Sequence, residues 1–174
     1  ERLLIGQKLA EFGDPRPGVG LRPDGLPDIA WIEIPPGQLQ LEGISHVFRV
    51  KQFRMAKYLV TNAQFQAFID DGGYANDAWW EEIQKEMPMP SDWQEANCPC
   101  ETVLWFEAVA FCRWLSHRTG TTIRLPTEWE WQQAATGGDP KRKYPWVGEW
   151  EASRCNSAQS RLKRTIAVGL YPSG

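Results

Sequence analysis

The sequence predicts an α+β fold in which short antiparallel strands and two to four short helices are joined by long irregular loops. Apolar residues occur in short runs, some with helical and some with strand spacing. Glycine and proline, 15 and 13 of the 174 residues, interrupt the longer runs. Ten tryptophans supply rings that can hold irregular backbone by packing, since each buries about 150–250 Å².

The first 27 residues are interpreted as an arm or linker from a larger protein. A short amphipathic helix is predicted from the apolar residues Leu4, Ile5, Leu9 and Phe12. The breakers from Gly13 to Pro27 then predict an extended segment without regular structure. We therefore expect the domain at residues 28–174, following a fused or associated N-terminal module, with Glu1 marking a cut inside a longer chain.

The domain is expected to begin with an antiparallel meander of three strands. The first is predicted at residues 30–34 and ends at Pro35-Pro36, the second at 38–41, and the third at 46–53, where apolar and polar residues alternate. Further strands are expected at 121–125 and 166–171.

Two helices are predicted from capping boxes, in which a threonine and a residue three positions later bond each other's backbone. Thr61 and Gln64 would begin a helix over residues 62–70, and Thr127 and Glu130 one that runs to about Ala135.

Two further helices follow from apolar spacing. The wide apolar face over residues 105–118 predicts the strongest helix, and Gly120 suits a left-handed end. Residues 77–85 predict a shorter helix with Trp80 and Ile83 directed inward.

Length, charge and cysteine content restrict the class of protein. A chain of 174 residues fits one domain that can bury a core without a metal or disulfide. Nineteen basic against 22 acidic residues make a general nucleic-acid binder unlikely. No run of 18 apolar residues is present, so no membrane span is expected. Four cysteines indicate reduced, mostly buried thiols and a cytoplasmic location.

Several separate motifs, in the right order, resemble those of the formylglycine-generating enzyme family, also called the sulfatase-modifying-factor domain. The motifs are residues 31–37, KYLVTNAQFQAF at 57–68, ETVLWFEAVAFCRWL at 101–115, IRLPTEWE at 123–130, and residues 144–146. The resemblance implies a C-type-lectin-like fold with long loops. It covers about residues 28–174 but only the first half or so of the family domain.

The resemblance also implies where the family's chemistry lies. Catalytic members place a copper-binding cysteine pair in the second half of the domain, where it activates oxygen and converts a sulfatase cysteine into formylglycine. Relatives in ergothioneine synthesis bind iron through a separate histidine-bearing domain, and this sequence holds only His46 and His117. We therefore assign no catalytic residue here. Copper binding is expected only if a missing C-terminal half or a complementing chain carries the cysteine pair.

Asn156 is the candidate for a calcium ligand, and it too comes from the resemblance. Catalytic relatives have an asparagine here that contributes to a structural calcium site. Residues 157–164 carry no acid and three basic side chains, which oppose a divalent cation. The competing interpretation is an asparagine that stabilises a turn.

The cysteines and acids have ordinary structural interpretations beside the functional ones. Cys98 and Cys100 could hold copper(I), but packing is favoured. Cys112 is expected in the core, and Cys155 in a loop where the thiol could be exposed. The acids of two helix ends, Glu128 with Glu130 and Asp70 with Asp71, suit caps better than acid–base or metal chemistry.

Surface candidates are a basic cluster and several tryptophans. The cluster consists of Lys141, Arg142, Lys143, Arg161, Lys163 and Arg164. It could bind nucleic acid or an acidic partner, but the simpler interpretation is a solvated surface. Trp79 and Trp80 are the candidates for stacking on a sugar, whereas the resemblance makes Trp146 part of a buried loop.

Taken together, the residues favour a non-catalytic recognition or scaffold module that binds a protein, peptide or other ligand within a larger protein. Two alternatives stay open. One is a copper-dependent formylglycine-generating oxidase whose cysteine pair lies beyond residue 174. The other is a ligand-binding variable protein with a C-type-lectin fold, diversified by a retroelement.

Overall fold

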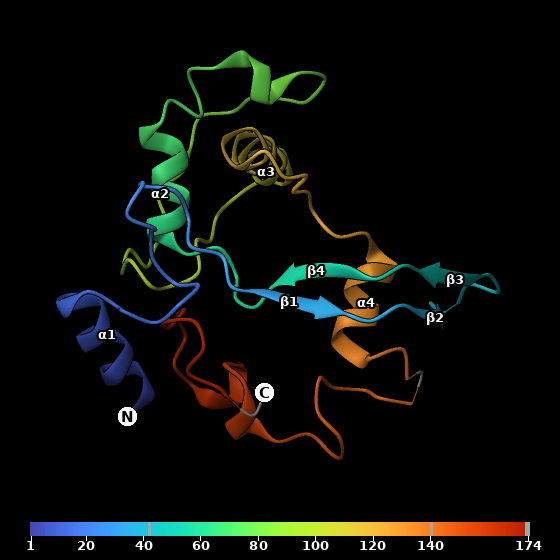
Figure 1. Cartoon of the computed structure of the whole chain (residues 1–174). Coiled ribbons are helices and arrows are strands. Elements are labelled where there is room, and N and C mark those ends of the chain that lie inside the picture. Colours follow the sequence, from blue (N-terminus) through green and yellow to red (C-terminus); the bar gives the residue numbers. More distant parts are fainter. Residues whose placement is uncertain (42, 140, 173–174) are drawn as a thin grey trace. The chain divides into compact units, whose positions relative to one another are not determined.

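The computed structural model describes residues 1–41, 43–139 and 141–172, which form two compact units (Figure 1). Unit 1 comprises Glu1–Ala30, Tyr58–Leu125 and Arg164–Leu170. Unit 2 comprises Trp31–Lys57 and Pro126–Lys163, together with the residues from Tyr171. Each unit thus combines segments that are distant in sequence, which is typical of a fold dominated by loops. Its mixture of helices with short antiparallel strands confirms the predicted α+β class.

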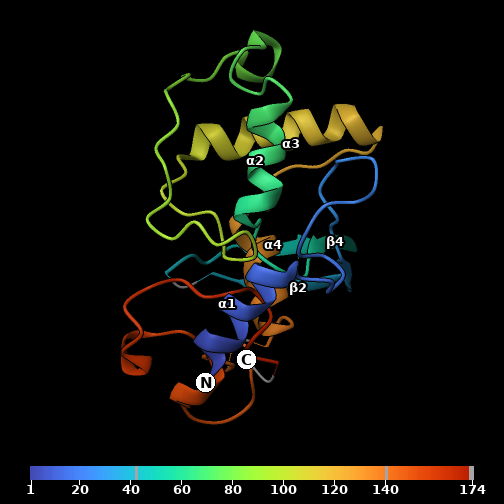
Figure 2. The same cartoon turned by 90° about the vertical axis from the view of Figure 1, so that its left-hand side faces the viewer.

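Unit 1 is built around two helices that pack on each other. Helix α2 (Asn62–Asp70) crosses α3 (Trp105–Thr119) in Figure 2, and the 3-10 helix η1 (Asp77–Trp80) packs on α3. A first helix, α1 (Arg2–Phe12), belongs to the same unit. The buried core between these elements consists of Leu26, Phe65, Phe68, Trp80, Ala110, Phe111, Cys112, Trp114 and Leu115.

The ends of α2 and α3 explain why these helices form where they do. The hydroxyl of Thr61 accepts the backbone N–H of Gln64, and the Gln64 side chain accepts the N–H of Thr61, which confirms the predicted capping box. Gly120 ends α3 in the left-handed conformation, with φ 66°, as predicted. The helix starts at Trp105 as predicted, but its cap was not foreseen: the buried carboxylate of Glu107 accepts the N–H of Leu104 at 2.6 Å.

Unit 2 contains a bent hairpin made of two antiparallel ladders. Strand β1 (Trp31–Ile34) pairs with β4 (Phe53–Ala56), and β2 (Gly37–Gln40) pairs with β3 (Val47–Val50). The two ladders share one register: Ile34 lies opposite Phe53, and Gly37 lies opposite Val50.

The predicted three-stranded meander is therefore wrong, because residues 46–53 contribute to two strands rather than one. The interruption places Pro35-Pro36 opposite Lys51-Gln52. Proline has no N–H to donate, so two consecutive prolines remove the ladder bonds at this point.

Helix α4 (Glu128–Thr136) packs on the β2–β3 ladder. The rings of Phe48 and Trp129 stack with centroids 4.8 Å apart, beside the buried cluster of Leu39, Leu41 and Val50. The predicted capping box of Thr127 and Glu130 is present, and Gly137 ends the helix in the left-handed conformation. The other described residues of unit 2 are loop, apart from two 3-10 turns, η2 (Ala152–Arg154) and η3 (Ala158–Ser160).

Other predicted elements differ from the structure. Residues 121–125 and 166–171 are not strands, because a side chain or a loop bonds their backbone. The hydroxyl of Ser116 accepts the N–H of Ile123 and donates to its carbonyl, and the N–H of Val168 donates to the carbonyl of Asn97. The helix predicted at 77–85 is only the 3-10 turn η1, although Trp80 is buried as expected.

None of the helices in the described parts of the chain combines the length and the apolar character that crossing a membrane requires.

Candidate functional site

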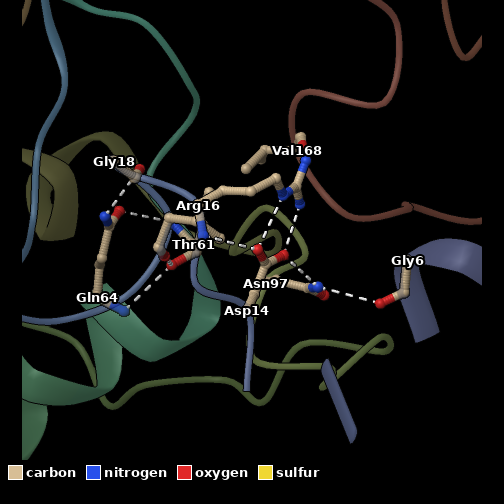
Figure 3. A network of polar contacts seen from close by, with 9 residues as sticks. Gly6, Asp14, Arg16, Gly18, Thr61, Gln64, Asn97 and Val168 are labelled. Carbon is tan, nitrogen blue, oxygen red and sulfur yellow. Dashed lines mark hydrogen bonds and ion pairs between the residues drawn. The ribbon is translucent and has the colours of Figure 1, made fainter. Parts of the chain in front are cut away.

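A buried polar network in unit 1 joins the N-terminal segment to helix α2 (Figure 3). The side chain of Gln64 is 1% exposed, and its amide nitrogen donates to the carbonyls of Gly18, Gly20 and Asp28, at 3.2, 3.3 and 2.7 Å. The hydroxyl of Thr61 donates to the carbonyl of Val19 at 2.8 Å. Both residues that cap α2 therefore also bind the preceding segment.

The residues before position 28 pack within unit 1, and their role as an arm or linker from a larger protein stays a prediction. Residues 13–27 have no helix or strand of their own, as their glycines and prolines predict, but Val19 and Leu26 are buried. Side chains elsewhere in unit 1 satisfy their backbone carbonyls, as irregular backbone requires when it is buried. The domain boundary at residue 28 stays a prediction.

The second half of the network is centred on Asp14. Its carboxylate pairs with Arg16 and accepts from the amide of Asn97 at 2.8 Å, and the same amide donates to the carbonyl of Gly6 at 3.0 Å. The guanidinium of Arg16 reaches the carbonyl of Val168 at 2.7 Å. These bonds fasten α1 and the segment before Leu170 to the loop that carries Asn97.

The charge of Asp14 is stabilised by its partners. Burial alone would raise the pKa of this carboxyl, but the hydrogen bonds from Arg16 and Asn97, with the charge of Arg16, hold the pKa below its usual value. A lowered pKa means that the ionised network stabilises the fold above about pH 4, the range of an unfolded aspartate, and that this contribution is lost as the pH falls further.

We expect the Asp14→Asn variant to be less stable at pH 7 by about 1.5–3 kcal/mol, the usual range for a hydrogen bond to a charged group. The difference from the unmodified protein should shrink as both are acidified from pH 6 to pH 3. Urea unfolding at several pH values measures it. Asp24→Asn is the matched control, because Asp24 pairs with Arg22 at the surface. A constant difference across this range would contradict the assignment.

The cysteines do not form a metal site in the described residues. All four thiols are free; Cys98 and Cys112 are buried, and Cys100 and Cys155 are partly buried. Burial raises the pKa of Cys98 and Cys100, and that of Cys112 to about 11, which disfavours the thiolate that a metal needs. The core position predicted for Cys112 is confirmed.

No three His, Cys, Asp or Glu side chains within residues 1–41, 43–139 and 141–172 lie close enough together to hold a metal ion. The described residues therefore do not fit the copper or iron centres that the resemblance implies for the family. Asp71, one of the acids considered for a metal, instead accepts from the indole of Trp114 and pairs with Arg118.

Asn156 lies in the exposed loop between η2 and η3 of unit 2. Its side-chain oxygen accepts the hydroxyl of Ser160 at 2.9 Å, and that hydroxyl also contacts the carbonyl of Ser157. The bond fits the turn-stabilising interpretation. Calcium binding by Asn156 stays a prediction.

The tryptophans and the basic cluster are partly engaged in packing. Trp80 is buried and donates to the carbonyl of Gly73, so its proposed surface role is wrong, whereas Trp146 is buried as expected. Trp79 is partly buried against the ring of His117. Arg164, one of the six basic residues, pairs with Glu95 and lies over the ring of Trp93.

Sequence reasoning missed the residues that hold the network together. Gln64 was recognised as a capping residue but not as the donor to three carbonyls, and Asn97 carried no periodic signal. A polar residue at an inward position of an amphipathic helix is the signal that could have identified Gln64.

The amino-acid sequence of the chain matches one family of known proteins. A family profile described as the "Sulfatase-modifying factor enzyme 1-like domain" matches residues 26–173. A hercynine oxygenase of Mycobacterium tuberculosis is 33% identical over 80% of this chain and 37% of its own length. The hercynine oxygenase of Mycolicibacterium smegmatis is 30% identical over 99% of this chain and 46% of its own length. A formylglycine-generating enzyme of Thermomonospora curvata is 30% identical, with coverages of 75% and 50%.

The chain thus spans between about a third and a half of the length of these curated relatives. All three carry the names of enzymes. The expectation of a non-catalytic recognition or scaffold module is therefore wrong, and the catalytic alternative is the better interpretation. The retroelement-diversified binding protein stays an untested prediction.

Proposed function

The chain belongs to the family of sulfatase-modifying factor enzyme 1-like domains, which have a C-type-lectin-like fold, and we propose that it is part of an oxygenase that acts on hercynine. One observation favours a hercynine oxygenase over the other members of the family. The match to the hercynine oxygenase of Mycolicibacterium smegmatis covers 99% of the chain, so it includes nearly all of the residues before the family profile begins at residue 26.

The structure gives a physical reason why a match to these N-terminal residues is informative. They are packed into unit 1 through Gln64, Asn97 and Asp14. A relative that shares this segment shares a part of the fold, whereas the formylglycine-generating enzyme of Thermomonospora curvata matches 75% of the chain.

Within such an enzyme, the residues described here serve as framework. The polar network holds α1, α2 and the segment before Leu170 together, and the aromatic core of α2 and α3 supports them. The described residues offer no three-residue metal group, so the reactive centre of the proposed oxygenase is assigned to other residues of the protein.

A formylglycine-generating oxidase is the second candidate. It is supported by the family description and by the 30% identity with the Thermomonospora curvata enzyme. Its substrate would be a cysteine in a sulfatase peptide, and its metal would be copper.

The two candidates are separated by one experiment on the full-length protein. In the first arm, the protein is loaded with iron(II) and supplied with oxygen, a small thiol as reductant and hercynine. In the second arm, it is loaded with copper(I) and supplied with oxygen and a cysteine-bearing sulfatase peptide. Oxygen uptake and the masses of the products are measured in both arms.

We expect oxygen uptake that depends on hercynine, with an oxygenated product of increased mass, in the first arm and no change of the peptide in the second. A peptide mass that reports conversion of cysteine to formylglycine, without turnover of hercynine, would replace the first candidate by the second. Turnover of neither compound by metal-loaded protein would overturn both.

A further inference from the structure

Helix α1 carries apolar side chains on two opposite sides. On one side, Gly6 is buried so closely that an added Cβ would lie 2.9 Å from the Cβ of Ala167. On the other, Leu4, Ile5 and Phe12 are 61%, 45% and 79% exposed. At about 100° per residue, these three lie within an arc of about 100° that faces away from Gly6. We refer to Leu4, Ile5 and Phe12 as the outer stripe.

The structure has the predicted helix and shows which of its sides is packed. A short amphipathic helix is predicted from the apolar residues Leu4, Ile5, Leu9 and Phe12. The structure packs the helix through its glycine, because Gly6 allows the backbone to approach the segment around Ala167, which Figure 1 shows beside α1. Three of the four apolar residues that predict the helix are left in the outer stripe.

A helix that is apolar on both sides is typical of one that is covered on both sides. The position of α1 is fixed, because the amide of Asn97 donates to the carbonyl of Gly6. The outer stripe is therefore presented as a defined surface rather than as one side of a free helix.

The charges beside the outer stripe indicate the chemistry of what covers it. Lys8 lies between its residues, pairs with Glu11 at 2.6 Å and lies 5.8 Å from the ring centroid of Phe12. The pair of Lys8 and Glu11 is neutral as a whole, so it favours neither phosphate groups nor a strongly charged protein. An apolar surface with few charges is the better partner for the outer stripe.

We propose that the outer stripe docks on an apolar surface of the same polypeptide, outside the 174 residues. The length of the relatives is the reason for choosing the same polypeptide as the partner of the outer stripe. The Mycolicibacterium smegmatis relative aligns with 99% of this chain, which must include nearly all of α1, and has more than half of its own length outside the alignment. The proposal does not depend on which substrate the enzyme uses.

The test compares two single cysteine substitutions in the full-length protein. Phe12→Cys places a thiol in the outer stripe, and Met87→Cys places one in a loop of unit 1 where the native side chain is 82% exposed. Each variant is treated with a maleimide, and labelling of each peptide is followed by mass spectrometry. The same proteins in urea give the rate of the unprotected thiol.

We expect the thiol at position 12 to react at least about tenfold more slowly than its urea reference, as for a group buried in an interface, and the thiol at position 87 at nearly its reference rate. Reaction of both at their reference rates would overturn the proposal. Protection at position 12 that disappears on dilution would also overturn it, because it would assign the outer stripe to a second copy.

A second measurement covers the case in which Phe12→Cys itself weakens docking. Phe12→Ser and Met87→Ser are compared by thermal unfolding of the full-length protein. If the outer stripe is covered, the first should lower Tm by several degrees more than the second. Equal and negligible effects, as expected for two exposed side chains, would contradict docking.

Discussion

Replacing Trp114 by alanine is expected to lower the free energy of unfolding by about 3–5 kcal/mol, the range measured for large aromatic residues in cores. The side chain is 1% exposed, and its ring lies 5.6 Å from the rings of both Phe68 and Phe111. Its indole N–H also donates to the carboxylate of Asp71 at 2.6 Å. Truncation would therefore leave a cavity and remove a hydrogen bond that helps to keep the pKa of Asp71 low.

Trp105 provides a matched control on the same helix. It is 61% exposed at the first turn of α3, so Trp105→Ala removes the same atoms from a position that is largely solvated. We expect it to change the stability by less than about 1 kcal/mol. Urea unfolding of both variants measures the two effects. Similar losses for the two tryptophans would show that α2 and α3 do not pack as described.

The second large effect is expected for Gln64→Leu, which should lower the free energy of unfolding by about 3 kcal/mol or more. Leucine has nearly the same size and no polar atoms. The substitution would leave the carbonyls of Gly18, Gly20 and Asp28, and the N–H of Thr61, without this partner. Each buried backbone group left unpaired costs about 1–3 kcal/mol.

Gln66→Leu is the control for this prediction. Gln66 lies on the same helix, but its side chain is exposed and bonds the carboxylate of Asp70. We expect a change within about 0.5 kcal/mol for Gln66→Leu. Hydrogen exchange gives a second readout, since Gln64→Leu should speed the exchange of amides in residues 18–28. Unchanged exchange there would argue that Gln64 does not hold the N-terminal segment.

Local signals explain which elements could be predicted. The helices begin and end as expected where a threonine can cap the first turn or a glycine can adopt a positive φ, as at Thr61, Thr127 and Gly120. These interactions join residues a few positions apart, so a single sequence contains them. The family and the fold class were recognised from motifs that surround the same caps.

The contacts that could not be predicted join distant residues. Ile123 has the spacing of a strand residue, but the hydroxyl of Ser116 takes the place of a neighbouring strand. The N-terminal segment has the composition of a linker, but Gln64 and Asn97, which lie far along the chain, give its backbone partners. Glycine and proline content predicts that backbone is irregular; it does not predict whether that backbone is buried.

The candidate site was the hardest part to predict, for a related reason. The chemistry of the family was assigned by resemblance to residues outside this chain, so the absence of catalytic side chains here was read as absence of catalysis. The relatives that match this chain are named as enzymes, which overturns that interpretation.

The paired prolines in the hairpin of unit 2 affect how the chain behaves before folding is complete. Exposed long strands recruit further strands and grow into aggregates. With Pro35 and Pro36 opposite Lys51 and Gln52, each ladder is limited to four residue pairs, and two of the flanking positions cannot donate at all. Short ladders interrupted by proline are poorer templates for further strands than one continuous ribbon would be.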